Sequence, residues 1–329
     1  MNLKIGLAYD LRKEYLAQGY PPEQVAEFDS EDTINQLDSA IKSLGYQTDR
    51  IGNCRQLCAR LSSGDRWDLV FNIAEGLFGR SREAQVPAIL ETFGIPYTFS
   101  DPLASAVTLD KNIAKRLVRD FGIPTAKFKL IENLCQLEHL SLEYPLFAKP
   151  VCEGTGKGID GNSRVETPAQ LTRICQRLLS EFSQPVLVEE FLPGREFTVA
   201  VLGNGLNAGV LGIMEIEMPG NSTGAIYSYD AKERCEELVR YVPYLKGPLL
   251  KPLEQLALKS YIALECRDAA RVDFRCDSKG DPAFLEINPL PGLHPTHSDL
   301  PMIATQQAMS YPELINTIIK NALARTRKG

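Results

Sequence analysis

Two short apolar segments near the C-terminus carry polar side chains at alternate positions. RVDF places Arg271 and Asp273 two residues apart, and LEIN does the same with Glu286 and Asn288. Because alternate residues of a strand share one face and the intervening DSKGDP is a turn sequence, we expect a hairpin that brings these side chains together. Carboxylate and amide oxygens without a neighbouring His or Cys are typical ligands of Mg²⁺. The alternative is a buried ion-pair network between Arg271 and Asp273.

A lysine followed by a glycine-rich loop is the second candidate site. Lys149 ends the apolar segment PLFAKP, where a lysine must reach water or meet an anion. The loop CEGTGKG (152–158) follows, and its glycines can turn backbone amides toward a phosphate. This loop is neither a Walker A motif nor the dinucleotide GxGxxG. Glycines alone would indicate a tight hairpin, whereas the adjacent lysine favours a phosphate-binding loop.

Other polar residues add weaker signals. Lys111 begins a predicted helix and, taken alone, would be a solvated lysine, while Lys232 lies in YSYDAKE. Glu196 follows VLVEEFLPG, and a carboxylate there suits ribose hydroxyls. His294 and His297 could form a metal pair, but a proline lies between them and no third ligand is near. For these histidines a substrate-facing loop is therefore favoured.

The composition is that of an ordinary globular protein with a small-molecule ligand. The chain has 329 residues, of which 44% are hydrophobic and 24% charged, and its formal net charge of -6 argues against a general nucleic-acid binder. No apolar run reaches membrane-spanning length, and the N-terminal one is too short for a signal peptide. The eight cysteines form no CxxC pair, as expected of reduced thiols. We therefore expect a cytoplasmic protein.

The N-terminal segment is expected to form a parallel α/β unit. LKIGLAY predicts a buried strand, followed by a helix that is capped by Asp29 or Ser30 and ended by Gly45. Strands near 46–51 and 68–72 alternate with helical segments. A unit of this kind binds ligands at the carboxyl ends of its strands.

The rest of the chain predicts two further lobes. Prolines and turn residues at 95–102 indicate a boundary, and one helix is expected at about 108–121. The segments AKFKLI, PLFAKP and PVLVEEF then predict strands of a second α/β lobe. From Glu196 onward the apolar segments predict a mostly antiparallel sheet, with helices near 250–264 and after Pro312.

Read in order, these motifs resemble a known family. DK at 110–111, PLFAKP, the glycine loop, VLVEEFLPGREF, YSYDAKE, ARVDF and LEINPLPG are similar to motifs of the ATP-grasp superfamily, in its D-alanine:D-alanine ligase-like branch. The resemblance implies an α/β protein with an α+β C-terminal lobe and a three-lobed ATP-grasp fold. Its implied domains are a Rossmann-like pre-ATP-grasp domain (1–99), a central lobe with a glycine-rich lid (100–190) and a C-terminal lobe with the magnesium and catalytic residues (191–329).

The resemblance also implies roles for individual residues. Those implied to hold the ATP phosphates are Lys111, Lys149, Lys232 and the lid residues Glu153, Gly154, Thr155, Gly156 and Gly158. Those implied to bind the nucleoside are Glu189, with the backbone of Glu190 and Leu192, for adenine, and Glu196 for ribose. The implied ligands of Mg²⁺, or of Mn²⁺ as a substitute, are Asp273, Glu286 and Asn288. The implied catalytic groups are Lys232, Arg271 and the amide of Gly292.

The implied activity is that of an ATP- and Mg²⁺-dependent carboxylate–amine ligase. Such an enzyme forms an amide or peptide bond through an acyl phosphate and releases ADP and phosphate. The alternative is a true D-alanine:D-alanine ligase of peptidoglycan precursor synthesis; a phosphotransferase and a non-catalytic nucleotide-binding protein are less favoured. The expected partners are small carboxylate and amine substrates related to amino acids, with no nucleic acid and no membrane, and with a homodimer as an alternative to a monomer.

The chain departs from the branch around the first-substrate pocket. Near the first strand AYDLRKEY replaces a glycine-rich turn, and neither Asp10 nor Glu14 is assigned the role of the glutamate that holds an ammonium group there. The segment EGLFGRSREAQ replaces an acidic one and brings Arg80, Arg82 and Glu83 to the pocket.

These departures lead to a prediction about the substrate. The guanidinium groups of Arg80 and Arg82 match carboxylates and phosphates, so the first substrate is expected to carry an extra anionic group. Ser298, in the C-terminal loop THSDLP, is a further expected substrate contact. The alternative is that the two arginines pair with Glu75 or Glu83 and brace their own loop.

Overall fold

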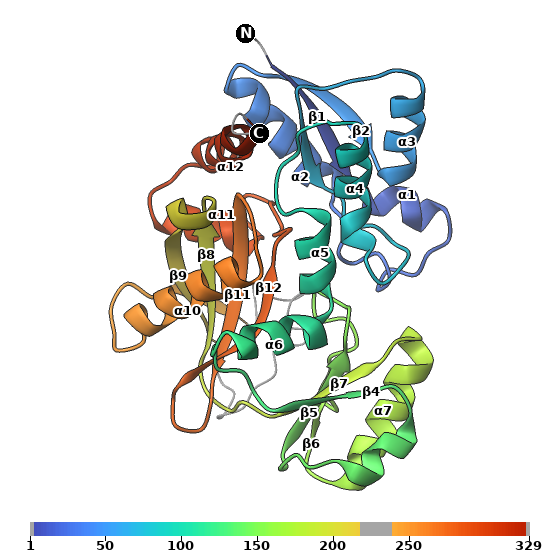
Figure 1. Cartoon of the computed structure of the whole chain (residues 1–329), viewed down its shortest axis with the longest axis vertical. Helices are drawn as coiled ribbons and strands as arrows, with labels where there is room; N and C mark the ends of the chain where they lie inside the picture. Colours follow the sequence, from blue (N-terminus) through green and yellow to red (C-terminus); the bar gives the residue numbers. More distant parts are fainter. Residues whose placement is uncertain (1–2, 218–238, 327–329) are drawn as a thin grey trace.

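The computed structural model describes residues 3–217 and 239–326, which form three sheets surrounded by helices (Figure 1). The N-terminal sheet lies at one end of the elongated molecule, and the sheet formed by β4 to β7 lies at the other. The third sheet, β8 to β12, lies between them on one side. Helices α5 and α6 run along the middle and join the first sheet to the rest.

The N-terminal sheet is parallel, with strand order β2-β1-β3, as predicted. Its strands are β1 (Lys4–Tyr9), β2 (Gln47–Gly52) and β3 (Leu69–Ile73). The helices around it are α1 (Arg12–Ala17), α2 (Glu31–Ser43), α3 (Cys54–Ser62), the 3₁₀ turn η1 (Arg82–Ala84) and α4 (Gln85–Thr92).

Helix α2 shows why the sequence pattern was informative here. The Ser30 hydroxyl accepts a hydrogen bond from the Thr33 amide at 3.1 Å, so Ser30 rather than Asp29 is the N-cap. Gly45 follows the helix with φ +87°, a left-handed conformation that favours glycine. The apolar residues spaced for one helical face are buried, namely Ile34, Leu37 and Ile41.

The helix predicted at about 108–121 is present but begins later than predicted, because another helix precedes it and the two meet at Asp110. Helix α5 (Pro102–Leu109) ends there and α6 (Lys111–Asp120) begins. Asp110 has extended backbone angles, and its carboxylate accepts a hydrogen bond from the Ile113 amide at 3.0 Å. A side-chain cap of this kind satisfies a free amide at the start of a helix, so the helical conformation is interrupted at Asp110. The break places Lys111 in the first turn of α6.

The second sheet is antiparallel with order β4-β7-β5-β6, and its strands lie where AKFKLI, PLFAKP and PVLVEEF predicted them. Its strands are β4 (Phe128–Ile131), β5 (Leu146–Pro150), β6 (Arg164–Val165) and β7 (Val186–Glu190). Its helices are the 3₁₀ helix η2 (Leu134–His139) and α7 (Pro168–Phe182). Leu171, Ile174 and Leu178 of α7 are buried against the sheet.

The third sheet is antiparallel, as predicted, with order β10-β9-β8-β11-β12. Its strands are β8 (Glu196–Leu202), β9 (Gly209–Glu217), β10 (Arg240–Pro243), β11 (Ala269–Cys276) and β12 (Pro282–Asn288). Its helices are the 3₁₀ turn η3 (Gly205–Asn207), α10 (Leu250–Ala263) and α11 (Asp299–Gln306). Leu253 and Tyr261 of α10 pack against Phe197 and Phe274 of the sheet.

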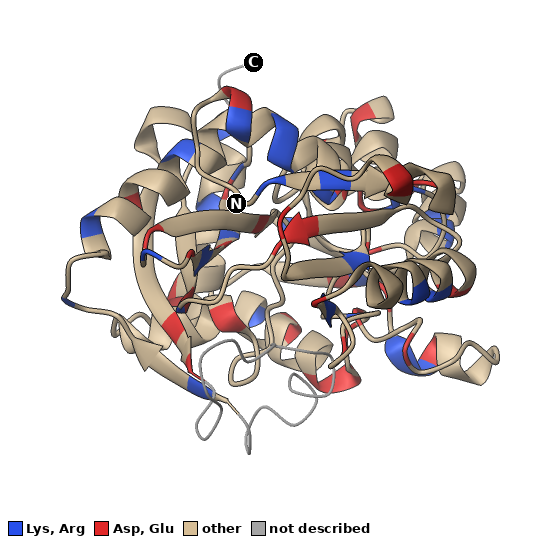
Figure 2. Cartoon of the chain, turned by 90° about the horizontal axis from the view of Figure 1, so that it is seen from below, with Lys and Arg blue, Asp and Glu red and all other residues tan. Residues whose placement is uncertain are grey.

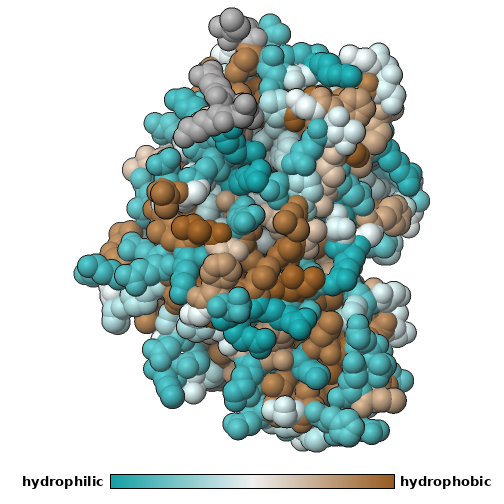
Figure 3. Space-filling view, in the orientation of Figure 1, coloured by the Kyte–Doolittle hydropathy of each residue, from teal (hydrophilic) through white to brown (hydrophobic). Residues whose placement is uncertain are grey.

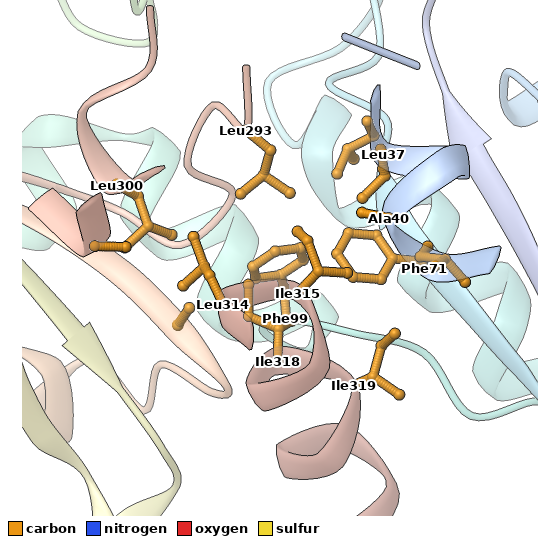
Figure 4. Packing of buried hydrophobic residues seen from close by; sticks show 14 of the residues in the cluster. Leu37, Ala40, Phe71, Phe99, Leu293, Leu300, Leu314, Ile315, Ile318 and Ile319 are labelled. Carbon is orange, nitrogen blue, oxygen red and sulfur yellow. The ribbon is translucent and has the colours of Figure 1, made fainter. Parts of the chain in front are cut away.

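The last helix, α12 (Tyr311–Thr326), packs against the first lobe of the chain. Figure 4 shows Ile315, Ile318 and Ile319 facing Phe71 and other residues of the N-terminal unit. Each of these isoleucines is fully buried, and burying one such side chain contributes about 1.5–3 kcal/mol. The end of the chain is therefore part of the core that holds the N-terminal sheet in place.

The described surface carries both signs of charge and exposed apolar residues. Basic and acidic segments are interspersed in Figure 2. Figure 3 shows an apolar area in the middle of the face seen in Figure 1. Leu103 of α5, Phe121 at the end of α6 and Ile262 of α10 are among the exposed apolar residues. Within the described residues, no helix combines the length and apolar character that crossing a bilayer requires.

Candidate active site

The predicted hairpin of polar side chains is formed. Strands β11 and β12 pair so that Asp273 lies opposite Glu286 and Arg271 lies opposite Asn288. Cross-strand partners share one face, so all four side chains point to the same side of the sheet. The Asn288 amide donates to Asp273 Oδ2 at 3.3 Å, and Lys111 Nζ lies 3.1 Å from Glu286 Oε2.

Each carboxylate on this face has a cationic partner within the chain. Arg271 Nη2 lies 2.9 Å from Asp273 Oδ2, and Arg271 Nη1 lies 2.8 Å from Asp299 Oδ2. Burial, with the nearby charge of Glu286, raises the pKa of Asp273, while Arg271 opposes this shift. The ion pair weighed as an alternative is thus present. The oxygen atoms of Asp273, Glu286 and Asn288 also fit Mg²⁺, which combines a few protein oxygens with water and phosphate ligands.

A narrow slot of about 100 Å³ opens beside the hairpin. Its apolar walls are Phe147, Ile159, Phe191, Leu192 and Leu285. Glu190 and Glu196 line the same slot, and Glu196 Oε2 lies 2.9 Å from the guanidinium of Arg275. Flat apolar walls with a few polar groups at the edge suit a nucleotide base and its ribose.

Two predicted residues, Lys149 and Glu189, meet at the end of the slot. Lys149 Nζ lies 2.7 Å from Glu189 Oε1, and Lys115 Nζ lies 2.7 Å from Glu189 Oε2. Burial works against the charge of Glu189, but the two lysines outweigh it and lower the pKa of this carboxyl to about 2. Sequence reasoning did not single out Lys115, although it follows Lys111 by one helical turn and so shares its face.

The glycine-rich loop is held in place by a residue of the N-terminal lobe. Glu27 accepts a hydrogen bond from the Gly154 amide at 2.6 Å, and its carboxylate also lies 2.9 Å from Lys157 Nζ. Gly158 has φ +73°, and a Cβ there would lie 2.7 Å from the Pro150 ring, so both the turn and the close approach require glycine. Glu27 was not predicted, and no local motif marks it.

Thr155 and Glu153 complete the described loop. Thr155 has φ +51°, and Glu153 Oε1 accepts a hydrogen bond from the Gln184 side chain at 2.7 Å. Lys111 Nζ donates to the Glu153 carbonyl at 2.6 Å. The loop is therefore tied to both α6 and the N-terminal lobe. Lys232 lies outside the described residues.

Both arginines of the first-substrate prediction pair with carboxylates of the chain. Arg80 is exposed, and its Nη2 lies 2.5 Å from Asp110 Oδ2. Arg82 is buried, donates to the Cys152 carbonyl at 2.9 Å, and lies 3.1 Å from Glu27 Oε2. The arginines thus brace their loop through Asp110 and Glu27, not through the predicted partners Glu75 or Glu83.

A larger cavity of about 460 Å³ lies next to the slot, between the N-terminal lobe and the hairpin. Its N-terminal side carries four carboxylates, Glu27, Asp29, Glu75 and Glu83, and we call it the acidic cavity. Its other side includes Lys111, Arg271, Glu286, Gly292 and Ser298. Burial raises the pKa of Glu75 and, to about 7 each, the pKa values of Asp29 and Glu83.

The loop after β12 closes the cavity. The Ser298 hydroxyl accepts a hydrogen bond from the His294 amide at 3.0 Å, and a Cβ on Gly292 would lie 2.8 Å from that hydroxyl. The rings of His294 and His297 lie 4.6 Å apart, and His294 Nε2 lies 3.0 Å from Asp32. Among the described residues no group of three or more His, Cys, Asp or Glu is arranged to hold a metal ion. Both histidines line the acidic cavity.

The chain is similar to known proteins along most of its length. The family described as "D-ala D-ala ligase C-terminus" matches residues 117–320. A D-alanine–D-alanine ligase of Chelativorans is 34% identical over 297 residues, which cover 88% of this chain and 91% of that protein. An uncharacterized protein, y4sG, of Sinorhizobium fredii is 38% identical over 259 residues, covering 78% of this chain and 75% of that one.

Solved structures share the fold. A D-alanine–D-alanine ligase of Bacillus anthracis complexed with ATP aligns with a TM-score of 0.74 at 23% identity and covers 99% of both chains. The VanG D-Ala:D-Ser ligase of Enterococcus faecalis aligns with a TM-score of 0.75 at 22% identity and covers 98% of this chain and all of that one. This chain therefore belongs to the D-alanine–D-alanine ligase family and is an ATP-dependent carboxylate–amine ligase with the ATP-grasp fold.

Proposed function

We propose that this chain activates the carboxylate of an amino acid with ATP and joins it to the amine of a second amino acid. The observation that supports the proposal is the position of the β11–β12 hairpin. Its Arg271 and Glu286 line both the slot and the acidic cavity, and Asp273 lines the slot, so a phosphoryl donor and an acceptor can meet there.

The slot is the proposed nucleotide site. Adenine would lie between its apolar walls, near Glu189 and the backbone of Glu190 and Leu192, with the ribose at Glu196. Lys111, Lys149 and the glycine loop border the adjoining space and would contact the phosphates. The proposed ligands of Mg²⁺ are Asp273, Glu286 and Asn288, and the bound ion would neutralise charge on the transferring phosphoryl group. Lys232 is proposed as a further phosphate contact on sequence grounds alone.

The proposed reaction has two steps. The substrate carboxylate attacks the γ-phosphorus of ATP, ADP leaves, and lysine charges offset the charge of the transferring oxygens. The amine then attacks the carbonyl of the acyl phosphate, and phosphate leaves. Arg271 and the Gly292 amide border the cavity where the oxyanion would form, and donors in such positions lower the barrier. The loop held by Glu27 would exclude water from the acyl phosphate.

The acidic cavity supports a substrate with an ammonium group. Both Arg80 and Arg82 are already paired within the chain, and four carboxylates line one side of the cavity. Opposite charge favours an amino acid there over a substrate with an additional anion. D-alanine is the second candidate for this position, because it is named in the relatives.

The domain division and the cellular location are also part of the proposal. The domain division 1–99, 100–190 and 191–329 remains a proposal, and α12 lies against the first of these units. A cytoplasmic location is supported by the need for ATP and by the described cysteines, all of which are free thiols.

An ADP-release screen tests the function. The protein, ATP and Mg²⁺ would be incubated with pairs of amino acids, including D-alanine with itself, and products would be identified by mass spectrometry. ADP and an amide product in equal amounts are expected for one pair. A phosphorylated product without an amide would instead indicate a phosphotransferase, and efficient D-alanyl-D-alanine synthesis would identify the second candidate.

A further inference from the structure

Lys115 is a lysine without exposed surface that lies behind the slot. It belongs to α6, and its relative exposure is 0%. An unpaired ammonium group in such a place would cost several kcal/mol, so its partners must compensate that cost. They are the Glu189 carboxylate at 2.7 Å, the Thr125 hydroxyl at 2.8 Å and the Phe284 carbonyl at 3.2 Å. The contacts with Thr125 and Phe284 are hydrogen bonds donated by the ammonium group, and the contact with Glu189 is an ion pair.

The Glu189 carboxylate is shared between two lysines from different elements. Strands β5 and β7 pair with Phe147 opposite Glu189, so Lys149 lies on the same face two residues further along β5. One carboxylate oxygen contacts Lys149 and the other contacts Lys115. Lys149 and Glu189 line the slot, whereas Lys115 lies behind them.

Lys115 also joins the two sheets that border the slot. The Phe284 carbonyl belongs to β12, two residues before Glu286, and Glu189 belongs to the second sheet. The Phe284 amide donates to the Pro124 carbonyl at 2.7 Å, and the Thr125 hydroxyl donates to the Phe284 carbonyl at 2.8 Å. A single ammonium group therefore contacts the lysine-bearing wall and the metal-ligand wall of the same site.

We propose that Lys115 is a positioning residue for the nucleotide, which holds the Glu189 carboxylate against Lys149 and sets the spacing of the two walls of the slot. This inference rests on the proposed nucleotide site. Without Lys115, one buried carboxylate would have a single cationic partner and one free oxygen. Glu189 would then draw Lys149 away from the phosphates or turn toward the base, and in both cases nucleotide binding weakens.

Direct nucleotide binding tests the proposal without knowledge of the substrates. The Kd of the full chain for a non-hydrolysable ATP analogue with Mg²⁺ would be measured by calorimetry for the wild type, Lys115→Met, Glu189→Gln and the double variant. Lys115→Met is expected to raise the Kd about tenfold or more, since breaking a buried ion pair leaves an uncompensated charge. In the Glu189→Gln background the same change should raise the Kd only about threefold or less, because the charge that needs Lys115 is gone.

Two further variants separate positioning from a loss of folding. Arg116→Met changes the next residue of α6, on its exposed face, and should leave the Kd unchanged. Thr125→Val removes only the hydroxyl that accepts from Lys115, and should raise the Kd about threefold while the fold is kept. If Lys115→Met does not fold, Thr125→Val decides, and an unchanged Kd in that variant overturns the proposal.

The outcomes also distinguish this inference from the proposed function. A wild-type chain that binds no nucleotide would refute the nucleotide site itself. Normal wild-type binding, with an equal Kd in Lys115→Met or with independent effects of the two substitutions, would refute only the role of Lys115. In an activity assay the positioning role predicts a higher KM for ATP and an unchanged KM for the carboxylate substrate.

Discussion

In the slot, the Glu189 carboxylate lies between two lysines, whereas in the neighbouring acidic cavity three carboxylates have no ion-pair partner among the described residues. The pKa values of the carboxyl groups in the two regions differ accordingly. The lysines lower the pKa of Glu189 to about 2, while burial raises the pKa values of Asp29 and Glu83 to about 7. In the slot, ion pairs within the chain hold the side chains in place before a ligand binds. In the acidic cavity, a cationic ligand can supply the missing partner of the carboxylates.

The two regions also differ in what builds them. The slot and hairpin use strands β5, β7, β11 and β12, in which side-chain direction follows from strand alternation. The carboxylates of the acidic cavity lie in the loops before α2 and after β3 and in the 3₁₀ turn η1, where no strand alternation fixes side-chain direction. The residues for chemistry common to a family can lie on strands. Loop residues that select the substrate can then vary without disturbing those strands.

The largest expected effect is on the rate of ADP formation, when a charged side chain on one of the strands is replaced. Lys149→Met and Glu286→Gln should each lower the rate of ADP formation about a hundred- to thousandfold, because each removes one preorganised charge. The measurement is steady-state ADP release with the substrate pair found in the screen, and circular dichroism would check the fold. Rates within a few-fold of the wild type would remove these residues from the phosphoryl-transfer site and break the comparison.

A smaller effect is expected where the two regions meet, at Glu27. Glu27→Gln keeps an acceptor for the Gly154 amide but loses the charge that faces Lys157 and Arg82. The loop should open more often, so limited proteolysis within 153–158 should become about tenfold faster. Glu31→Gln, which removes an exposed partner of Lys13, is the matched control. The protease should cleave its loop no faster than that of the wild type.

The pH dependence should separate the slot from the cavity. Between pH 6 and 8 Asp29 and Glu83 lose protons, so the cavity becomes more negative and the KM for an amino-acid substrate should fall several-fold. Glu189 is ionised throughout this range, so the KM for ATP should not change with it. A substrate KM that rises with pH would instead support an anionic substrate group.

The free energy of unfolding should fall as the pH rises and Asp29 and Glu83 lose their protons. The pKa values of Asp29 and Glu83 are higher in the folded chain than in an unfolded one, so the stability that their protonated forms contribute is present at low pH. That contribution is lost as the pH rises through about 7. Urea unfolding at pH 6 and 8 measures the difference, and Asp29→Asn should reduce it.

The smallest effect is expected at Arg80, whose side chain is 69% exposed. Arg80→Ala removes a surface ion pair with Asp110, which is worth about 1 kcal/mol or less, so the substrate KM should change less than about twofold. A strong loss of substrate affinity in this variant would restore the anionic-substrate hypothesis.

Much of the chemistry could be predicted from the sequence because it depends on short-range rules. Strand alternation predicts that Arg271 and Asp273 share a face, and Glu286 and Asn288 likewise, and the DSKGDP turn predicts the hairpin that the structure shows. The order of the motifs, read as a resemblance, indicated the family and its fold, which the comparisons confirm. These signals act over a few residues or over motif order, and neither needs tertiary contacts.

Only the tertiary structure could decide which distant groups meet. Glu27 lies 127 residues from Gly154 and 130 residues from Lys157, so no local pattern connects them. For Arg82 the sequence predicts either a substrate contact or an ion pair that braces its loop, because a guanidinium attracts any carboxylate, and the fold brings Glu27 to it. Lys115 looks like an ordinary helix lysine until α6 is set against β7 and β12. Long-range burial decides whether a charge meets solvent, a ligand or another side chain, and the sequence alone leaves that choice open.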